Sequence, residues 1–93
     1  MSNHYIQGAT VRLSTEIRDA NRVLVDPTTI TLKTENPSGA EQTYTDAVKD
    51  AIGKYHRDVL ASTVGTWYWR WEAAGIFQQV DEGDFVVDRS AFF

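Results

Sequence analysis

Apolar and polar residues alternate along two segments of the chain. Val11, Leu13 and Ile17 are separated by charged or hydroxyl-bearing residues, and Ile30 and Leu32 repeat the pattern further on. A period of two places every second side chain on the same face of a β-strand. We therefore predict two strands, each with one buried and one solvent-facing row.

Turn-forming residues separate these segments from the next ones. The tetrad 36–39 is Asn-Pro-Ser-Gly, in which proline fixes φ and glycine tolerates positive φ, so a hairpin loop is predicted there. Residues 42–45 would form the return strand. Residues 46–53 have a mixed pattern and could be a loop or an irregular edge segment.

The second half of the chain continues in short segments. Residues 54–60 carry apolar side chains on both faces, among them Tyr55 and Val59, as expected of a strand between two covered surfaces near the centre of the fold. After the aromatic run described next, we predict a turn at 73–75, a strand at 76–80, an acidic turn at 81–84 and a last strand at 85–87.

The most distinctive run is Trp67-Tyr68-Trp69-Arg70-Trp71-Glu72. Three tryptophans at a spacing of two share one face of a strand. They could form an exposed platform for sugar rings, but a domain with so few leucines needs their volume between its sheets, so burial is the preferred interpretation. Tyr68, Arg70 and Glu72 would then face solvent or a partner.

The composition supports strands over helices. Valine, isoleucine and threonine outnumber leucine and methionine in the 93 residues, and β-branched side chains suit pleated surfaces. Seven or eight short strands at roughly ten-residue intervals predict an all-β antiparallel sandwich. The chain has room for one domain, residues 1–93, with loose or partner-docking ends at 1–7 and 88–93.

The predicted core collects the inward-facing residues of these strands. They are Val11, Leu13, Ile17, Ile30, Leu32, Tyr55, Val59, Trp67, Trp69, Trp71 and Phe85.

The net charge and the absence of cysteine argue against several classes of function. The formal net charge is −4, which disfavours a nucleic-acid or anionic-membrane surface. Without cysteine there is no disulfide, thiolate metal site or thiol nucleophile. We also see no leader sequence and no membrane-spanning run, and we expect no cofactor.

Two polar constellations could carry chemistry. His56 and Asp58 share a strand face, but no further ligand or nucleophile pattern completes a metal or catalytic site. Asp81, Glu82 and Asp84 could hold calcium, yet they lack the spacing of a calcium loop and are better explained as a solvated turn. We therefore predict a protein that is not an enzyme.

The chain ends on two phenylalanines, Phe92 and Phe93. A free tail is normally polar, so two interpretations stand equal at this point. The rings fold back over their own sandwich as a lid, or they dock on another subunit.

With these segments in place, the chain resembles small immunoglobulin-like β-sandwich virion proteins of tailed bacteriophages and prophages. The Cys-Trp-Cys core of antibody domains is absent. The resembling segments are Gly8–Leu13, Val25–Leu32, Asn36–Gly39, Gly53–His56, Gly65–Glu72 and Asp81–Val87.

This resemblance implies a virion accessory protein, made in the bacterial host cytoplasm and built into the particle. It would decorate and stabilise the capsid, or sit at the neck or tail, and its partners would be other virion proteins and copies of itself. The contacts would involve Tyr68, Arg70 and Glu72, strand edges, and the Phe92–Phe93 tail. The alternative is a carbohydrate-binding or adhesive module, in which tryptophans or Tyr44 stack on sugars.

Overall fold

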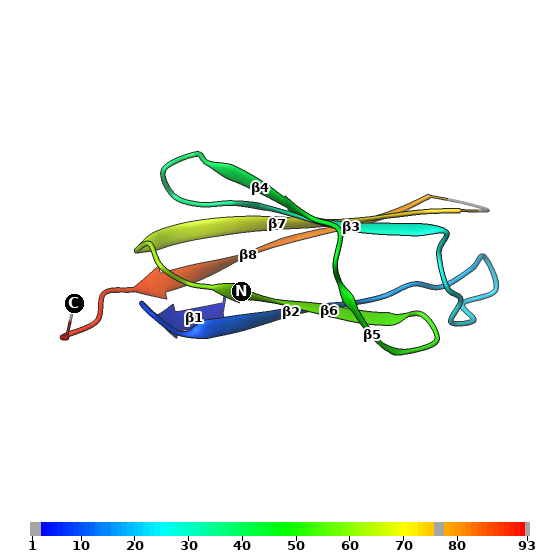
Figure 1. The fold of residues 1–93 in the computed structure, drawn as a ribbon, viewed down its shortest axis with the longest axis horizontal. Helices are drawn as coiled ribbons and strands as arrows, with labels where there is room; N and C mark the ends of the chain where they lie inside the picture. Colours follow the sequence, from blue (N-terminus) through cyan, green and yellow to red (C-terminus); the bar gives the residue numbers. More distant parts are fainter. Residues whose placement is uncertain (1–2, 76–77, 93) are drawn as a thin grey trace.

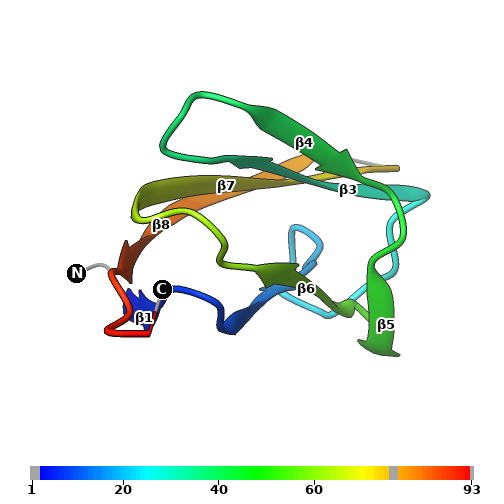
Figure 2. The ribbon, with the colours of Figure 1, turned by 60° about the vertical axis from the view of Figure 1, so that its left-hand side comes forward.

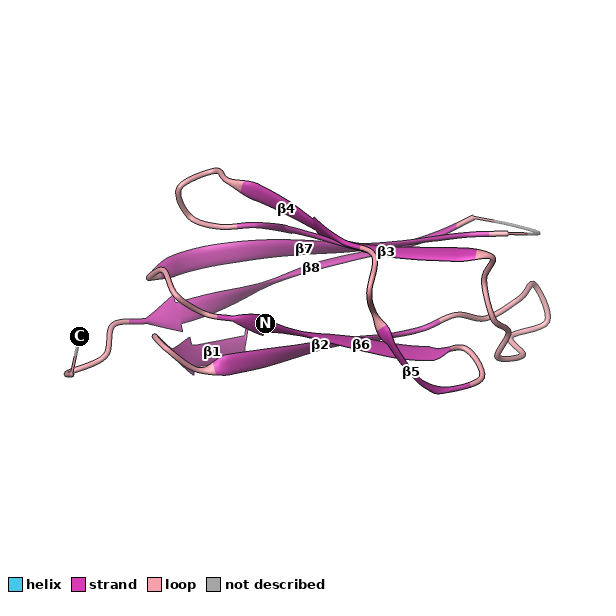
Figure 3. Ribbon diagram, viewed as in Figure 1, coloured by secondary structure: helices cyan, strands magenta, loops and turns pink. Residues whose placement is uncertain are grey.

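A computed structural model describes residues 3–75 and 78–92. Figure 3 shows strands and loops throughout this part of the chain, and none of the described residues forms a helix that could cross a membrane. The strands are β1 (Asn3–Ile6), β2 (Thr10–Glu16), β3 (Thr29–Glu35), β4 (Glu41–Tyr44), β5 (Val48–Ala51), β6 (Lys54–Leu60), β7 (Gly65–Ala74) and β8 (Gln79–Asp88).

The strands form two sheets packed face to face. One sheet has five strands in the order β1-β8-β7-β3-β4, and the other has three in the order β2-β6-β5. The two layers are visible in Figure 1, and the turned view in Figure 2 separates them again. The prediction of an all-β sandwich with about eight strands is confirmed.

The five-stranded sheet is centred on β7. Its residues pair antiparallel with β3 on one side and with β8 on the other, so that Trp69 lies between Thr34 and Gly83. The predicted hairpin also forms, since β3 pairs antiparallel with β4 around the loop at 36–40. β7 is therefore covered on both edges and on its inner face, and only its outer face is open to other groups.

The N-terminal segment differs from the prediction. Asn3–Ile6 lies within the end predicted to be loose or partner-docking, but it forms β1, and β1 pairs parallel with β8 in an otherwise antiparallel sheet. The ring of Tyr5 packs edge-on against Phe85, with ring centroids 5.6 Å apart. A single inward aromatic residue leaves no alternating pattern, which explains why this strand could not be predicted from the sequence.

β7 and β8 are both longer than predicted. β7 continues through residues 73–74 instead of turning, because Ala73 is buried against the core. Residues 81–84 are not a turn, since they pair in register with β7 inside one continuous strand. The expected strand at 76–80 is described only from residue 78, and Ile76 and Phe77 lie outside the described residues.

The three-stranded sheet differs from the prediction in one respect. β6 lies in the middle of this sheet, but its outer face is open to solvent, and Leu60 there is 59% exposed. It is therefore central within its sheet without being covered on both sides. The undecided segment 46–53 contains β5, an edge strand whose pairing shifts register between Lys49 and Ala51.

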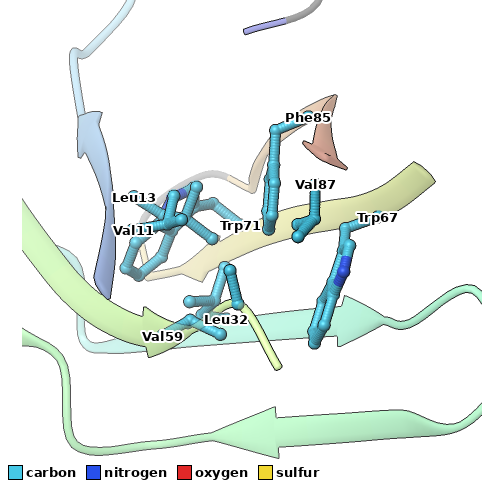
Figure 4. Close-up of a cluster of buried hydrophobic side chains, with 9 residues drawn as sticks. Val11, Leu13, Leu32, Val59, Trp67, Trp71, Phe85 and Val87 are labelled. Atoms are coloured by element: carbon cyan, nitrogen blue, oxygen red, sulfur yellow. The ribbon is translucent and has the colours of Figure 1, made fainter. Parts of the chain in front are cut away.

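The core fills the space between the two sheets, as Figure 4 shows. The rings of Trp67 and Phe85 stack with their centroids 5.6 Å apart and their planes at 15°. Of the residues predicted for the core, Ile30 and Trp69 are only partly buried and pack against the rest. The buried ones are Val11, Leu13, Ile17, Leu32, Tyr55, Val59, Trp67, Trp71 and Phe85.

Candidate docking surface

The outer face of the five-stranded sheet is its side opposite the core. Because Trp67, Trp69 and Trp71 point inward, the residues that alternate with them on β7 point outward. The structure thus brings Tyr68, Arg70 and Glu72 together in one row on the central strand. Tyr68 is 54% exposed, whereas Arg70 and Glu72 are half-buried.

An ion network fixes the charged part of this row. The Arg70 guanidinium donates hydrogen bonds to Glu72 Oε2 at 3.0 Å and to Glu82 Oε2 at 3.1 Å, and Lys33 Nζ lies 3.1 Å from Glu72 Oε1. Lys33, and then Arg70, hold the pKa of Glu72 below its usual value of 4.5. Glu82 and Glu72 raise the pKa of Arg70 above its usual range. Both cations are therefore paired within the chain.

A second row runs across the strands, shares Tyr68 with the first row, and is otherwise acidic. The strand register aligns Glu41 with Glu35, Glu35 with Tyr68, and Tyr68 with Asp84 across four strands. Glu35 and Glu41 lie directly opposite each other, and like charges in this position are destabilising. Neither has an ion pair with any residue that the structure describes.

A shallow groove runs between this acidic row and the parallel register line of Lys33, Arg70 and Glu82. It consists of two adjoining hollows of about 130 and 350 Å³ that share Tyr68, Trp69 and Glu82. Thr34, Trp69 and Gly83 form its floor. These three residues pair in register across the sheet, and their side-chain positions are on the inner face, so none of them rises between the two walls. We call this feature the transverse groove; its walls are Glu35, Glu41, Tyr68 and Asp84 on one side and Lys33, Arg70 and Glu82 on the other.

Tyr44 shows how the chain itself binds a cation on an aromatic ring. The Arg57 guanidinium carbon lies 4.4 Å from the centre of the Tyr44 ring, and Arg57 Nε donates to Asp46 Oδ1 at 2.9 Å. This hydrogen bond is the main reason that the pKa of Asp46 lies below its usual value of 3.8. Arg57 covers one face of Tyr44, so that face does not offer a surface for a sugar ring.

The tryptophans do not form an exposed platform. Trp67 and Trp71 are 6% and 1% exposed, and the Trp67 indole N–H donates to the carbonyl oxygen of Thr63 at 2.8 Å. Trp69 is partly exposed, but its ring lies against Gly83 on the inner side of the sheet. The aromatic side chain that β7 offers to a partner is Tyr68.

Phe92 lies apart from the transverse groove. It is 97% exposed, and Figure 1 shows the C-terminus projecting beyond the tip of β8 at one end of the sandwich. The Phe92 ring therefore does not act as a lid on its own domain. Phe93, predicted beside it, lies outside the described residues.

His56 and Asp58 lie on the same face of β6 but pair with different residues. His56 Nδ1 lies 2.7 Å from Asp50 Oδ2, whereas Asp58 pairs with Arg12 at 2.9 Å. Ser14 lies opposite His56 in the sheet, but no hydrogen bond between their side chains is found among the described residues. The residues that the structure describes contain no group of three or more His, Asp or Glu side chains arranged to hold a metal ion.

Sequence reasoning identified the β7 residues of this surface but missed their neighbours. Lys33, Glu35 and Glu82 come from segments far apart in the chain, and only the pairing of β3 and β8 with β7 brings them beside Tyr68. The alternation of Lys33 and Glu35 with the core residue Leu32 was a usable sign that they face outward. The acidic run at 81–84 stands out in the sequence, but its pattern indicates a turn and not a strand.

Comparison of the chain with protein-family models, with curated proteins and with solved structures found no match in any of the three.

Proposed function

We propose that this chain is a non-enzymatic structural protein that docks through the outer face of its five-stranded sheet. The observation that carries the proposal is Tyr68, more than half exposed at 54% on the central strand of an unpartnered sheet face. Exposed tyrosines flanked by charged residues are typical anchors of protein interfaces. This surface chemistry supports recognition of a protein partner over catalysis.

The size of the face suits such a contact. The molecule measures 46 × 25 × 23 Å, so a broad side covers about 1,150 Å². A standard protein interface buries about 800 Å² on each partner. One broad side of this sandwich could therefore supply a whole interface.

We further propose that the partner is a virion and that the chain is a phage accessory protein, first of all a capsid decoration protein, with the neck or tail as the other location. The virion assignment rests on the resemblance of the sequence, and the strand order supports its immunoglobulin-like part. The series β8-β7-β3-β4 and β2-β6-β5 correspond to the G-F-C-C′ and B-E-D series of immunoglobulin-like sandwiches. Bound copies would stabilise the particle by mass action.

Rebinding to particles tests the proposal. Particles produced from the encoding genome after deletion of this coding sequence would be mixed with purified protein, and the bound copies measured after sedimentation. We expect saturable binding, and an approximately tenfold or greater loss of affinity for Tyr68→Ala. Lys54→Ala, on the three-stranded sheet, is the control and should bind normally. If no protein sediments with the particles, the virion assignment is wrong; if Tyr68→Ala binds like wild type, the docking face is wrong.

A further inference from the structure

The transverse groove has a charge that its own cations do not balance. Lys33 and Arg70 on one wall are already paired with Glu72 and Glu82. The opposite wall carries Glu35 and Glu41 side by side, with no cation of the described chain near enough to form an ion pair with either. The free protein therefore retains a like-charge contact that a cation from outside would relieve.

The ring of Tyr68 lies in the same acidic row. Glu35 is its neighbour on β3, so the aromatic face and a carboxylate are adjacent on one surface. Among the described residues, the guanidinium that stacks on a tyrosine is Arg57, and it stacks on Tyr44. Arg70, the arginine nearest in register, turns instead to Glu72 and Glu82.

The Arg57 site is a template for what the transverse groove lacks. There, one guanidinium stacks on Tyr44 at 4.4 Å and pairs with Asp46 at 2.9 Å. Tyr68 and Glu35 repeat the tyrosine and the carboxylate, but no guanidinium is present. A planar guanidinium satisfies both partners at once, whereas an ammonium group has no plane to stack and no fork for two-point pairing with a carboxylate.

We propose that the transverse groove receives an arginine side chain of the docking partner, stacked on Tyr68 and paired with Glu35 and Glu41. This inference rests on the proposed docking function and adds the chemistry of the partner's anchor. The partner segment carries positive charge, which complements the acidic wall. Salt should weaken the contact because the charges on this face are solvent-exposed.

A titration followed by nuclear magnetic resonance tests the groove without the particle. The probe is N-acetyl-arginine amide, at concentrations up to about 100 mM because a single side chain binds weakly. We expect shifts of the Tyr68 ring and of Glu35 and Glu41 amides. N-acetyl-citrulline amide, which has the same shape without charge, should leave them unchanged, and N-acetyl-lysine amide should bind more weakly than arginine.

Two variants localise the effect. Glu35→Gln should weaken arginine binding about three- to tenfold, and Tyr68→Leu should do the same by removing the ring. Glu16→Gln removes one negative charge from the three-stranded sheet and should leave binding unchanged. Equal shifts with citrulline, shifts that avoid Tyr68, or no shifts at all would overturn the inference.

The two proposals can fail separately. If particles bind the wild-type protein and Tyr68→Ala weakens that binding, yet arginine amide does not shift the groove, the docking face stands and the arginine anchor is wrong. If arginine amide shifts the groove but particles bind no protein, the virion assignment is wrong and the groove serves another partner.

Discussion

Gly83 explains why the acidic segment of β8 is a strand. A Cβ built on Gly83 would lie 2.3 Å from Cζ2 of Trp69, which is far inside any contact distance. Only glycine leaves room for the indole to lie across β8 at this register position. From the sequence, Gly83 between acidic residues indicated a turn, because its partner on the neighbouring strand could not be seen.

We predict that Gly83→Ala is destabilising, although alanine is normally the better strand residue. The added methyl group must displace the Trp69 ring, and overpacking of this kind costs about 1–3 kcal/mol. Urea denaturation of the variant measures the loss.

A double-mutant cycle provides the control. In a Trp69→Ala background the ring is absent, so Gly83→Ala should change the free energy of unfolding by less than about 0.5 kcal/mol. Equal costs in both backgrounds would mean that the Trp69 ring is not what requires glycine at residue 83.

At the scale of elements, Asp26 joins the long connection between β2 and β3 to the second sheet. Its carboxylate accepts hydrogen bonds from Lys49 Nζ at 2.7 Å, from the Gly53 amide at 3.0 Å and from the Tyr55 hydroxyl at 3.0 Å. Lys49 on β5, then the Gly53 amide, hold the pKa of Asp26 below its usual value of 3.8. Burial, and then Asp26, raise the pKa of Tyr55.

This arrangement predicts an acid-dependent contribution to stability. Because the folded-state pKa of Asp26 lies below 3.8, its stabilisation is complete above that pH and is lost as the pH falls through the lower folded-state value. Asp26→Asn should therefore lower Tm by a few degrees at pH 7, and the difference from wild type should shrink at acid pH.

The difference in Tm is the informative quantity. Asp46, Asp58 and Glu72 also have lowered pKa values, so the wild-type protein loses stability in acid for several reasons. Thermal melts of wild type and Asp26→Asn between pH 7 and about pH 2 isolate the contribution of Asp26 to the loss of stability in acid. A difference that stays constant over this range would exclude the titration of Asp26 as its origin.

The elements that could be predicted are those whose determining residues lie within the element or next to it along the chain. β2, β3 and the loop between β3 and β4 carry their own alternation and turn residues, and the sequence predicted them. β1 depends on Phe85, and the continuity of β8 depends on Trp69; both partners lie far away along the chain or across the sheet. Of the outer face of the five-stranded sheet, the sequence indicated only the β7 residues, for the same reason.

At the scale of the whole molecule, the broad side and the end of the sandwich differ in the contact area that they can offer to a partner. The end of the sandwich from which the C-terminus projects has a cross-section of 25 × 23 Å, or about 575 Å². This area is below the roughly 800 Å² that a standard interface takes from each partner. This end therefore suits a secondary contact that adds to docking through the sheet face.

This end of the sandwich exposes apolar side chains, so we expect the secondary contact to be hydrophobic. Leu60 and Ser62 line a hollow together with Gln7 and Gly8, and Leu60 is 59% exposed. Phe92, at 97% exposure, lies four residues after Asp88, whose carbonyl oxygen accepts a hydrogen bond from the Gln7 amide at this hollow. In the free protein, the ring of Phe92 contributes almost no buried surface, so under the docking proposal we expect this ring to be buried by a partner.

Deletion of residues 92–93 should therefore separate folding from assembly. We expect the free energy of unfolding to change by less than about 0.5 kcal/mol, as for other exposed positions, while binding to particles weakens about ten- to hundredfold, the value of burying one phenylalanine ring. Phe92→Ser keeps the chain length and should reproduce most of the loss. A truncated protein that unfolds would restore the lid interpretation, and one that folds and binds normally would confine docking to the sheet face, where the Tyr68 variants then carry the whole effect.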